Sequence, residues 1–211
     1  MSRCVIVTAA PLPDEKGIAA MRSMLRADDV LYAADNGWRL AQALGVSIAC
    51  LIGDFDSGDH PPVAVVSRTV TLPTVKDETD TLAAVRLAQS EGFVDFLILG
   101  SLGGRFDHTL ANLAVLQYIA NAGGCAVMSD GFNEIYMTAP SQITVSPREG
   151  YFSLLPYGGE VTGLSVFGAF YDVKDITLTT DNPLGVSNTF CGKEVTVSYK
   201  SGNLLLIFSK D

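Results

Sequence analysis

The stretch FVDFLILGSLGGRFDHTLANLAVLQYIA, residues 93–120, indicates the fold class of the chain. It opens with a continuous apolar run at 93–100, which is typical of a central parallel strand covered on both faces. A glycine-rich turn follows, and apolar residues then recur at helical spacing over 108–120. Strand, glycine-rich turn and helix in this order predict an α/β sheet, in which ligands bind beyond the carboxyl ends of the strands.

The same alternation runs through the first part of the chain. Strand-like and helix-like segments follow one another at 4–10, 14–27, 30–36, 38–45, 48–54 and 79–90. After about residue 140 only short β-rich runs are found, separated by Gly, Pro, Asn or Asp. We therefore predict an α/β N-terminal domain over 1–139, with a mostly parallel sheet and flanking helices, and a C-terminal all-β sandwich domain over 140–211.

Composition excludes several classes of function. The chain has 211 residues, of which 48% are hydrophobic and 18% charged, so it can fill a core. Its formal net charge is −9 and it has no stripe of Lys and Arg, which argues against nucleic acid as a partner. No apolar run reaches the roughly 18–20 residues needed to cross a bilayer, so we expect no membrane partner.

Cysteine usage and the N-terminus bear on location. The four cysteines form no CxxC pair, and three of them lie in apolar, strand-like runs. We therefore expect buried thiols in a reducing compartment. The N-terminal residues enter a strand-like run without a signal-peptide pattern, so we expect a cytoplasmic protein.

Polar clusters stand after strands or at the starts of helices. They lie at 33–37, 53–57, 76–80 and 100–108. Each has a structural alternative: Asp35 suits a turn, Asp77 or Thr79 suits a helix cap, and His108 suits a first helical turn. Together they lie where ligands bind in open α/β sheets, and this favours a functional site.

The acidic residues of these clusters suggest a hard metal ion. Asp54 and Asp56, if extended, point to the same side about 6.5 Å apart. Asp77 and Asp80 are neighbours on one face if a helix starts there. Mg²⁺ is typically held by one or two carboxylates with waters and substrate phosphates, whereas the His and Cys clusters that zinc requires are missing from the sequence.

The cluster at 100–108 suits a phosphate. Its glycines let the backbone approach an anion, and the following helix offers its N-terminal amides. Arg105 supplies a planar fork of donors for phosphate oxygens. Neither the Walker pattern GxxxxGK[ST] nor the dinucleotide pattern GxGxxG is present, so another scaffold must bind the phosphate.

The motifs DNGWRLAQALG, LIGDFDS, KDETDTLAA and LGGRFDHTLANL resemble, in order and spacing, those of thiamine pyrophosphokinases. The later GVSNTF and GNLLLIFS resemble that family's C-terminal thiamine-binding region. The resemblance implies an α/β nucleotide-binding domain joined to a β-sandwich in a homodimer. It also implies transfer of pyrophosphate from ATP to thiamine, which gives thiamine diphosphate and AMP.

The resemblance also implies roles for individual residues. The Mg²⁺ and catalytic site comprises Asp54, Asp56, Asp77 and Asp80, with Arg105 and Asp107 as further catalytic residues. Nucleotide binding falls to Asp35, Asn36, Lys76, Gly103, Gly104, Arg105, His108 and Asn112. Thiamine contacts across the subunit interface fall to Ser187, Asn188 and Leu206.

This chain departs from the family pattern at three of these positions. Asn36 replaces a glycine that many members have in the first motif, and His108 replaces a glutamine. Leu206 stands where animal members carry an aromatic residue that stacks on thiamine. These departures concern the thiamine pocket more than the acidic site.

Pyrophosphoryl transfer depends on positioning and charge neutralisation more than on covalent chemistry by the protein. Mg²⁺ and Arg105 would take up negative charge, and Asp80 or Asp107 would orient or deprotonate the hydroxyl of the acceptor. One alternative is a related Mg²⁺-dependent phosphotransferase or hydrolase that acts on another alcohol or nucleotide. An alternative of another class is a non-catalytic nucleotide-sensing module.

Overall fold

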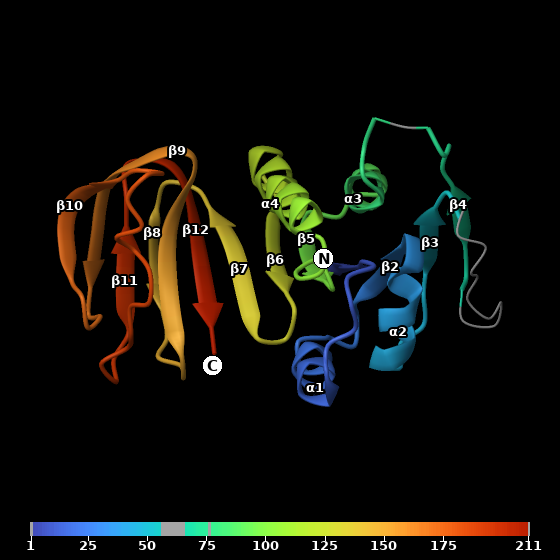
Figure 1. Ribbon diagram of the computed structural model, residues 1–211, viewed down its shortest axis with the longest axis horizontal. Coiled ribbons are helices and arrows are strands. Elements are labelled where there is room, and N and C mark those ends of the chain that lie inside the picture. Colours follow the sequence, from blue (N-terminus) through green and yellow to red (C-terminus); the bar gives the residue numbers. More distant parts are fainter. Residues whose placement is uncertain (1, 56–65, 76, 211) are drawn as a thin grey trace. The chain divides into compact units, whose positions relative to one another are not determined.

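The computed structural model describes residues 2–55, 66–75 and 77–210 (Figure 1). The chain divides into two compact units, Met1–Gly131 and Phe132–Asp211. In the first unit strands alternate with helices, whereas the described elements of the second unit are all strands. The whole chain is thus a mixed-sheet protein with few helices.

The first unit is built on a parallel sheet. Its strands lie in the order β4-β3-β2-β1-β5-β6, and each neighbouring pair is parallel. Their bounds are β1 Cys4–Val7, β2 Val30–Ala34, β3 Cys50–Gly53, β4 Thr69–Thr71, β5 Asp95–Leu99 and β6 Cys125–Ser129. The central strands are buried along most of their length, as their continuous apolar runs predict.

Helices cover both faces of this sheet. They are α1 Glu15–Ser23, α2 Trp38–Leu44, α3 Asp80–Ser90 and α4 Phe106–Asn121, with a 3₁₀ turn η1 at Asp35–Gly37. Figure 1 shows α1 and α2 on one side of the strands and α3 and α4 on the other. Alternate strand residues therefore face different helices: Val5 and Val7 pack in one core with Met21 of α1 and Leu40 of α2.

Local signals in the sequence fix where the helices begin and end. Asp14 caps α1, since its carboxylate accepts a hydrogen bond from the Gly17 amide at 2.9 Å. Thr79 caps α3 in the same way, because its hydroxyl accepts from the Leu82 amide at 3.3 Å. Gly45 ends α2 in the left-handed conformation, with φ of 73°.

The strand order creates a switch point in the sheet. Chain connections run outward from β1 toward β2, β3 and β4 on one side, and from β5 to β6 on the other. The loops that follow β1 and β5 therefore diverge at the carboxyl ends of these adjacent strands. Such a divergence leaves a crevice, which is where open α/β sheets bind ligands.

The second unit is antiparallel. Its strands are β7 Asn133–Thr138, β8 Gln142–Val145, β9 Tyr151–Phe167, β10 Val173–Leu178, β11 Val195–Ser198 and β12 Ser201–Ser209. They lie in the order β7-β12-β9-β11-β8, and β10 also pairs with β9. The long strand β9 pairs with β12 in its first half and with β10 and β11 in its second half. The strands thus surround one core, which includes Phe152, Leu164 and Leu206.

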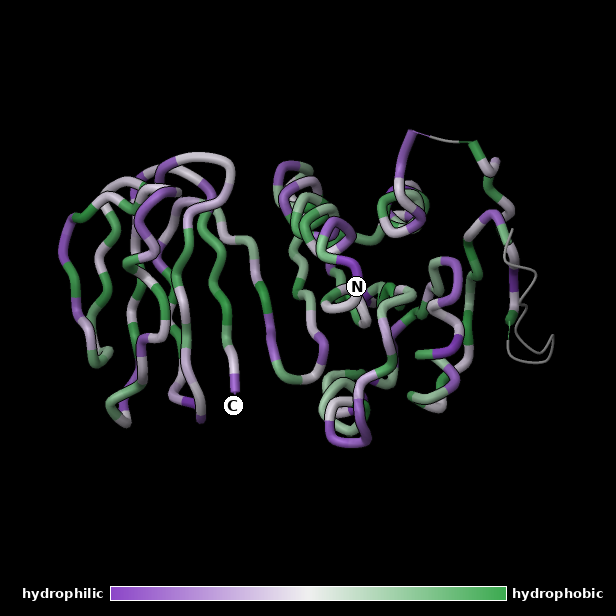
Figure 2. The backbone as a smooth tube through the Cα atoms, viewed as in Figure 1, coloured by the Kyte–Doolittle hydropathy of each residue, from purple (hydrophilic) through white to green (hydrophobic). Residues whose placement is uncertain are grey.

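Hydropathy follows this division. In Figure 2 hydrophobic colour concentrates on the strands of the second unit, and hydrophilic colour concentrates in the loops between them. Along β9 the buried residues Phe152 and Leu154 alternate with more exposed neighbours, which is the pattern of a sheet with one face on a core.

Two expectations from sequence differ from the structure. The chain forms β4, β6 and β7 before residue 140, where no strand was predicted. Cys4 and Cys50 are buried as expected, but Cys125 and Cys191 are exposed. Cys125 is exposed because it is the first residue of β6, at the end of its run. No helix among the described residues is long and apolar enough to span a membrane.

Candidate active site

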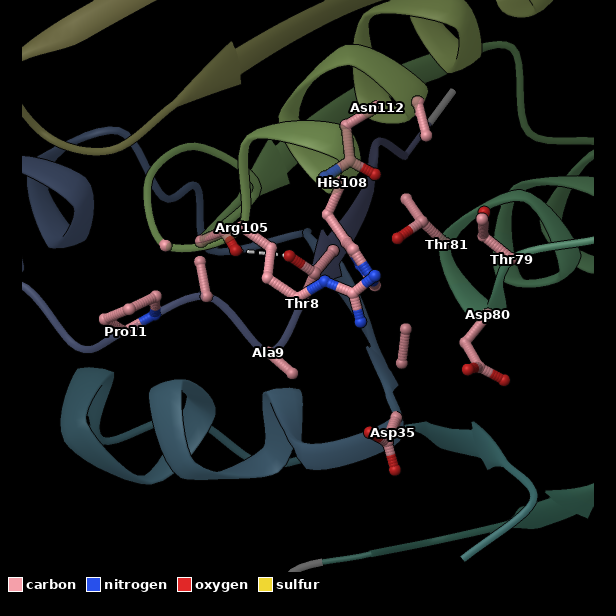
Figure 3. A pocket seen from close by; sticks show the side chains of 15 residues that line it. Thr8, Ala9, Pro11, Asp35, Thr79, Asp80, Thr81, Arg105, His108 and Asn112 are labelled. Carbon is pink, nitrogen blue, oxygen red and sulfur yellow. Dashed lines mark hydrogen bonds between the residues drawn. The ribbon is translucent and has the colours of Figure 1, made fainter.

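A cavity of about 450 Å³ lies at the carboxyl ends of β1, β2 and β5 (Figure 3). Its walls come from the loop after β1, from the start of α3, and from the glycine-rich turn and first turns of α4. Polar side chains in these walls are Thr8, Asp35, Thr79, Asp80, Thr81, Arg105, His108 and Asn112. The cavity therefore occupies the crevice that the strand order creates.

The floor of the cavity is held by contacts between the ends of β1 and β5. The Thr8 amide donates to the Leu99 carbonyl at 2.9 Å, and the Thr8 hydroxyl donates to the Gly100 carbonyl. Gly100 has φ of 67°, and a Cβ there would lie 2.6 Å from Leu40 Cδ2 and 2.9 Å from the Thr8 carbonyl oxygen. Only glycine fits this close approach, so the sequence at 100 fixes the shape of the floor.

The first motif places a carboxylate at the rim. Asp35 follows β2 with φ of 48°, a left-handed conformation that Asp tolerates better than most residues. Gly37 packs against β1 so closely that a Cβ would lie 2.2 Å from the Val7 carbonyl oxygen. Asn36 lines an adjoining cavity of about 430 Å³ with the loop 8–12 and α2.

The glycine-rich turn presents Arg105. Gly103 and Gly104 have φ of 86° and 66°, which lets the chain turn tightly before α4. Arg105 and Asp107 form a bidentate ion pair, with Nε–Oδ1 at 3.1 Å and Nη2–Oδ2 at 2.6 Å. The hydrogen bonds from Arg105 hold the pKa of the Asp107 carboxyl below its ordinary value, and those to Asp107 raise the pKa of Arg105.

The predicted acidic residues are only partly brought together. Asp80, the first residue of α3, lines the cavity with Asp35, whereas Asp54 and Asp77 are not among its lining residues. Asp77 precedes the helix, so the condition for a shared helical face with Asp80 is not met. Asp56 and Lys76 lie outside the described residues.

The chain turns just before Asp56. β3 ends at Gly53, and Phe55 has φ of 54°, so the backbone is not extended at Phe55. Because Asp56 lies outside the described residues, the pairing of Asp54 with Asp56 stays a prediction. Within the ranges that the structure describes, no group of three or more His, Cys, Asp or Glu residues could hold a metal ion by itself.

The donor set nevertheless fits Mg²⁺. Figure 3 shows Asp35 and Asp80 toward one end of the cavity, with Arg105 and His108 across from them. Magnesium needs only one or two protein carboxylates, because waters and phosphate oxygens complete its octahedron. Asp35 was predicted as a nucleotide contact and not as a metal ligand, so its place beside Asp80 adds a carboxylate to this end.

A second cavity, of about 440 Å³, lies within the second unit. Aliphatic side chains from β9, β10 and the loop 184–186 form most of its wall, and Tyr171, Asp172 and Asn188 add polar groups. The side chain of Asn188 links two loops by hydrogen bonds. Its Oδ1 accepts from the Tyr171 amide at 3.0 Å, and its Nδ2 donates to the Tyr171 carbonyl at 2.9 Å. The side chain of Asn188 therefore fixes the backbone at Tyr171.

The other two predicted thiamine contacts differ in setting. Ser187 is exposed, has φ of 59°, and donates its amide to the Ser153 hydroxyl at 3.0 Å. Leu206 is only 5% exposed and belongs to the hydrophobic core of the unit. Ser187 is thus accessible on the surface of this unit, whereas Leu206 packs inside it.

Comparison with known families identifies the chain. The family model described as "Thiamin pyrophosphokinase, catalytic domain" matches residues 21–128, which is more than half of the chain. The chain belongs to the thiamine pyrophosphokinase family. A second model of the same family, "Thiamin pyrophosphokinase, vitamin B1 binding domain", matches residues 141–204.

Individual relatives agree with this family. The thiamine pyrophosphokinase of Bacillus subtilis is 27% identical over 165 residues, which cover 75% of this chain and 77% of that protein. Thiamin pyrophosphokinase 1 of Caenorhabditis elegans is 25% identical over 170 residues, with 75% and 68% covered. Both belong to an enzyme family, as the name of the catalytic-domain model states.

Solved structures show the same fold. The crystal structure of the Bacillus subtilis thiamine pyrophosphokinase has a TM-score of 0.86 at 23% identity, with 100% of both chains covered. Thiamin pyrophosphokinase from Candida albicans has a TM-score of 0.79 at 15% identity, with 99% of this chain and 89% of that chain covered. At this level of identity the likeness shows the fold alone.

The family ranges can be set beside the two cavities. Most lining residues of the first cavity lie within the catalytic-domain match, and all lining residues of the second lie within the vitamin B1 match. Sequence reasoning missed the loop 8–11 and Thr81 in the first cavity, and Tyr171 and Asp172 in the second. The strand-like run was drawn to residue 10, whereas β1 ends at Val7, so residues 8–10 were counted as strand and not as a loop beyond a strand end.

Proposed function

We propose that this chain transfers the pyrophosphate group of ATP to the hydroxyl group of thiamine and so produces thiamine diphosphate and AMP. The observation that carries the proposal is a polar cavity at the switch point of the sheet, in a chain of the thiamine pyrophosphokinase family. Its volume of about 450 Å³ suits a nucleotide. In this proposal residues 1–139 form the α/β domain that binds ATP and Mg²⁺, and 140–211 form a β-sandwich that binds thiamine.

Asp54, Asp56, Asp77 and Asp80 are the proposed carboxylates of the Mg²⁺ site. Asp80 has the strongest support, because it lines the cavity at the start of α3, and the Asp35 carboxylate lies at the same end. Bound Mg²⁺ would supply positive charge that offsets the triphosphate in a chain of net charge −9.

Arg105 is the proposed cation for the phosphates. Asp107 occupies its Nε and one N–H of Nη2, so the remaining N–H groups are available to phosphate oxygens. The ion pair also orients the guanidinium, which is 73% exposed and would otherwise move freely. Gly103, Gly104 and His108 complete this wall, and Lys76 is a proposed further cation from the motif before α3.

Asp80 is the proposed residue that orients or deprotonates the thiamine hydroxyl. The alternative was Asp107, but Asp107 faces Arg105 and does not line the cavity. Its lowered pKa also makes it a weaker base than an ordinary aspartate. Asp80 lines the cavity directly, and this supports its assignment to the hydroxyl.

The second cavity is the proposed site for the rings of thiamine. Its aliphatic wall suits an organic ring, and Asp172 at its edge suits the positive charge of thiazolium. Asn188 would act by holding Tyr171, which is 62% exposed and offers an aromatic face. Leu206 would support the pocket from the core, and Ser187 would contact the ligand.

The proposed assembly is a cytoplasmic homodimer in which thiamine sites form between subunits. Size-exclusion chromatography with light scattering tests this directly at the enzyme concentration of the assay. A dimer is the expected result, whereas a fully active monomer would contradict thiamine contacts shared between subunits.

One incubation with ATP, Mg²⁺ and thiamine, followed by separation of the products, tests the activity. We expect AMP and thiamine diphosphate to appear in equal amounts. ADP with thiamine monophosphate would overturn pyrophosphate transfer, and AMP formed only with another alcohol would favour the related transferase. Nucleotide binding without any turnover would favour the sensing module.

A further inference from the structure

Asn112 places a buried side-chain amide in the wall of the first cavity. It lies in the second turn of α4, is 7% exposed, and lines the cavity beside His108 and Ala111. A polar side chain is costly to bury unless its hydrogen-bonding groups are satisfied. The partners of this amide therefore indicate what the cavity accepts at this place.

One hydrogen bond fixes the orientation of the amide. Asn112 Nδ2 donates to the Ser101 carbonyl at 2.8 Å, and no other side-chain hydrogen bond of Asn112 is found among the described residues. A flipped amide would place its oxygen against the Ser101 carbonyl oxygen and lose this bond. One N–H group and the oxygen Oδ1 of Asn112 therefore remain for a ligand. Because the amide does not flip, the positions of this donor and this acceptor are fixed.

The figure agrees with this orientation. Figure 3 shows the nitrogen of Asn112 toward the glycine-rich turn and its oxygen toward Thr81, which is likewise buried. Asp35 and Asp80, at the proposed Mg²⁺ end, lie at the other side of the cavity, and Figure 3 shows the guanidinium of Arg105, the proposed phosphate contact, between them and Asn112. A nucleotide whose phosphates lie near these carboxylates would have its nucleoside directed toward the wall that carries Asn112.

We propose that Asn112 recognises the nucleobase and makes this site select adenine. Its Oδ1 accepts from the exocyclic amino group of adenine, and its free N–H donates to a neighbouring ring nitrogen. Hypoxanthine has an oxygen in place of that amino group, so two acceptors would face each other. This inference rests on the proposed use of a nucleotide, but it does not depend on thiamine as the acceptor.

Calorimetry with Mg²⁺-ATP and Mg²⁺-ITP, without thiamine, tests the proposal. We expect the unsubstituted chain to bind ATP about 5- to 150-fold more tightly than ITP, the range for one good bidentate amide–base pair. Asn112→Ala should bind ATP more weakly by most of that factor, whereas its affinity for ITP should change by less than about 3-fold. Asn121→Ala, an exposed asparagine on the same helix, is the matched control and should change neither.

Each outcome decides the question. Equal losses for ATP and ITP in Asn112→Ala would show that the amide only holds Ser101, and unchanged ATP affinity would show no contact with the base. If that variant does not fold, the unsubstituted chain still decides, because equal affinity for ATP and ITP overturns the proposal. If calorimetry shows a clear preference for ATP but the thiamine assay gives no product, only the proposed acceptor is rejected.

Discussion

The cavity of the first unit and that of the second have nearly the same volume, about 450 Å³ and about 440 Å³, but their walls carry different polar groups. The first collects carboxylates, a guanidinium and amide groups where parallel strands end. The second is enclosed mainly by aliphatic residues of antiparallel strands. Strand ends are followed by loops and helix starts that carry polar groups. Within a strand, side chains alternate between the two faces, and one of these faces is apolar. Equal volumes therefore suit a charged nucleotide in one case and an organic ring in the other.

The largest expected effect comes from removing a charge in the polar cavity. Asp80→Asn should lower kcat by about 10²- to 10³-fold, the range for losing one group that acts on developing charge. The structure of the unit should survive, since Thr79 still caps α3. Steady-state AMP formation and circular dichroism measure the two parts of this prediction.

Asp95→Asn is the control for that variant, because Asp95 is partly exposed, is the first residue of β5 at the end away from the cavity, and forms an ion pair with Arg26. It should keep kcat within about 2-fold, as expected for an exposed ion pair of little energy. Near-normal turnover in folded Asp80→Asn would show that this carboxylate of the first cavity does not act in the reaction.

Gly37→Ala and Gly185→Ala form a matched pair, one for each unit. A Cβ would lie 2.2 Å from the Val7 carbonyl oxygen in the first and 2.0 Å from the Leu154 carbonyl oxygen in the second. Each should lower the free energy of unfolding by about 1–3 kcal/mol, as overpacked positions do. Chemical denaturation measures that loss.

The kinetics of this pair should separate the cavities. Gly37→Ala should raise the KM for ATP more than that for thiamine, and Gly185→Ala should do the reverse. Gly159→Ala is the control for both, because a Cβ at Gly159 would meet no described atom within 4 Å. If both variants raise the two KM values in the same proportion, the cavities do not divide the substrates.

Tyr171→Ala should have a smaller effect, confined to the apolar cavity. Loss of an aromatic face from a bound cation costs about 0.5–2 kcal/mol, so the KM for thiamine should rise about 2- to 30-fold. The KM for ATP should stay constant. Tyr171→Phe keeps the ring and should restore the original value; failure of that rescue would argue against stacking.

The smallest effect concerns the Arg105–Asp107 pair. Arg105 lowers the pKa of Asp107, so the pairing is present above the ordinary aspartate pKa and is lost as pH falls through the lowered value. Arg105→Gln should therefore raise the Asp107 pKa toward about 4, its ordinary range. NMR titration of the side-chain carboxyl groups measures the pKa of Asp107. Arg86→Gln, which removes the ion-pair partner of Glu78, is the control and should leave the pKa of Asp107 unchanged. An unchanged Asp107 pKa in Arg105→Gln would show that the pair is not formed in solution.

The sequence predicted some of the polar cavity for physical reasons that act locally. Apolar runs indicated β1 and β5, and the end of β5 places Gly100 where ligands bind. The glycines at 103 and 104 and the start of a helix indicated how Arg105 would be presented. These features depend on neighbours along the chain, so they can be inferred without long-range contacts.

Other features could not be read in this way. The backbone takes a left-handed φ at Phe55, directly after Asp54, and the start of α3 at Asp80 leaves Asp77 outside the helix. Tyr171 joins a cavity because Asn188, 17 residues later, bonds to its backbone. Such contacts result from the folded chain, and sequence spacing does not encode them.

The sequence by itself determined the family, the parallel pattern of the first part and the residue types of the proposed acidic, phosphate-binding site. Only the tertiary structure decided that Asp35 and Asp80 share a cavity with Asn112, and that Leu206 lies in a core. The reason is that hydrophobic periodicity and turn residues act over a few positions. The meeting of side chains depends on strand order and register, which bring distant segments together.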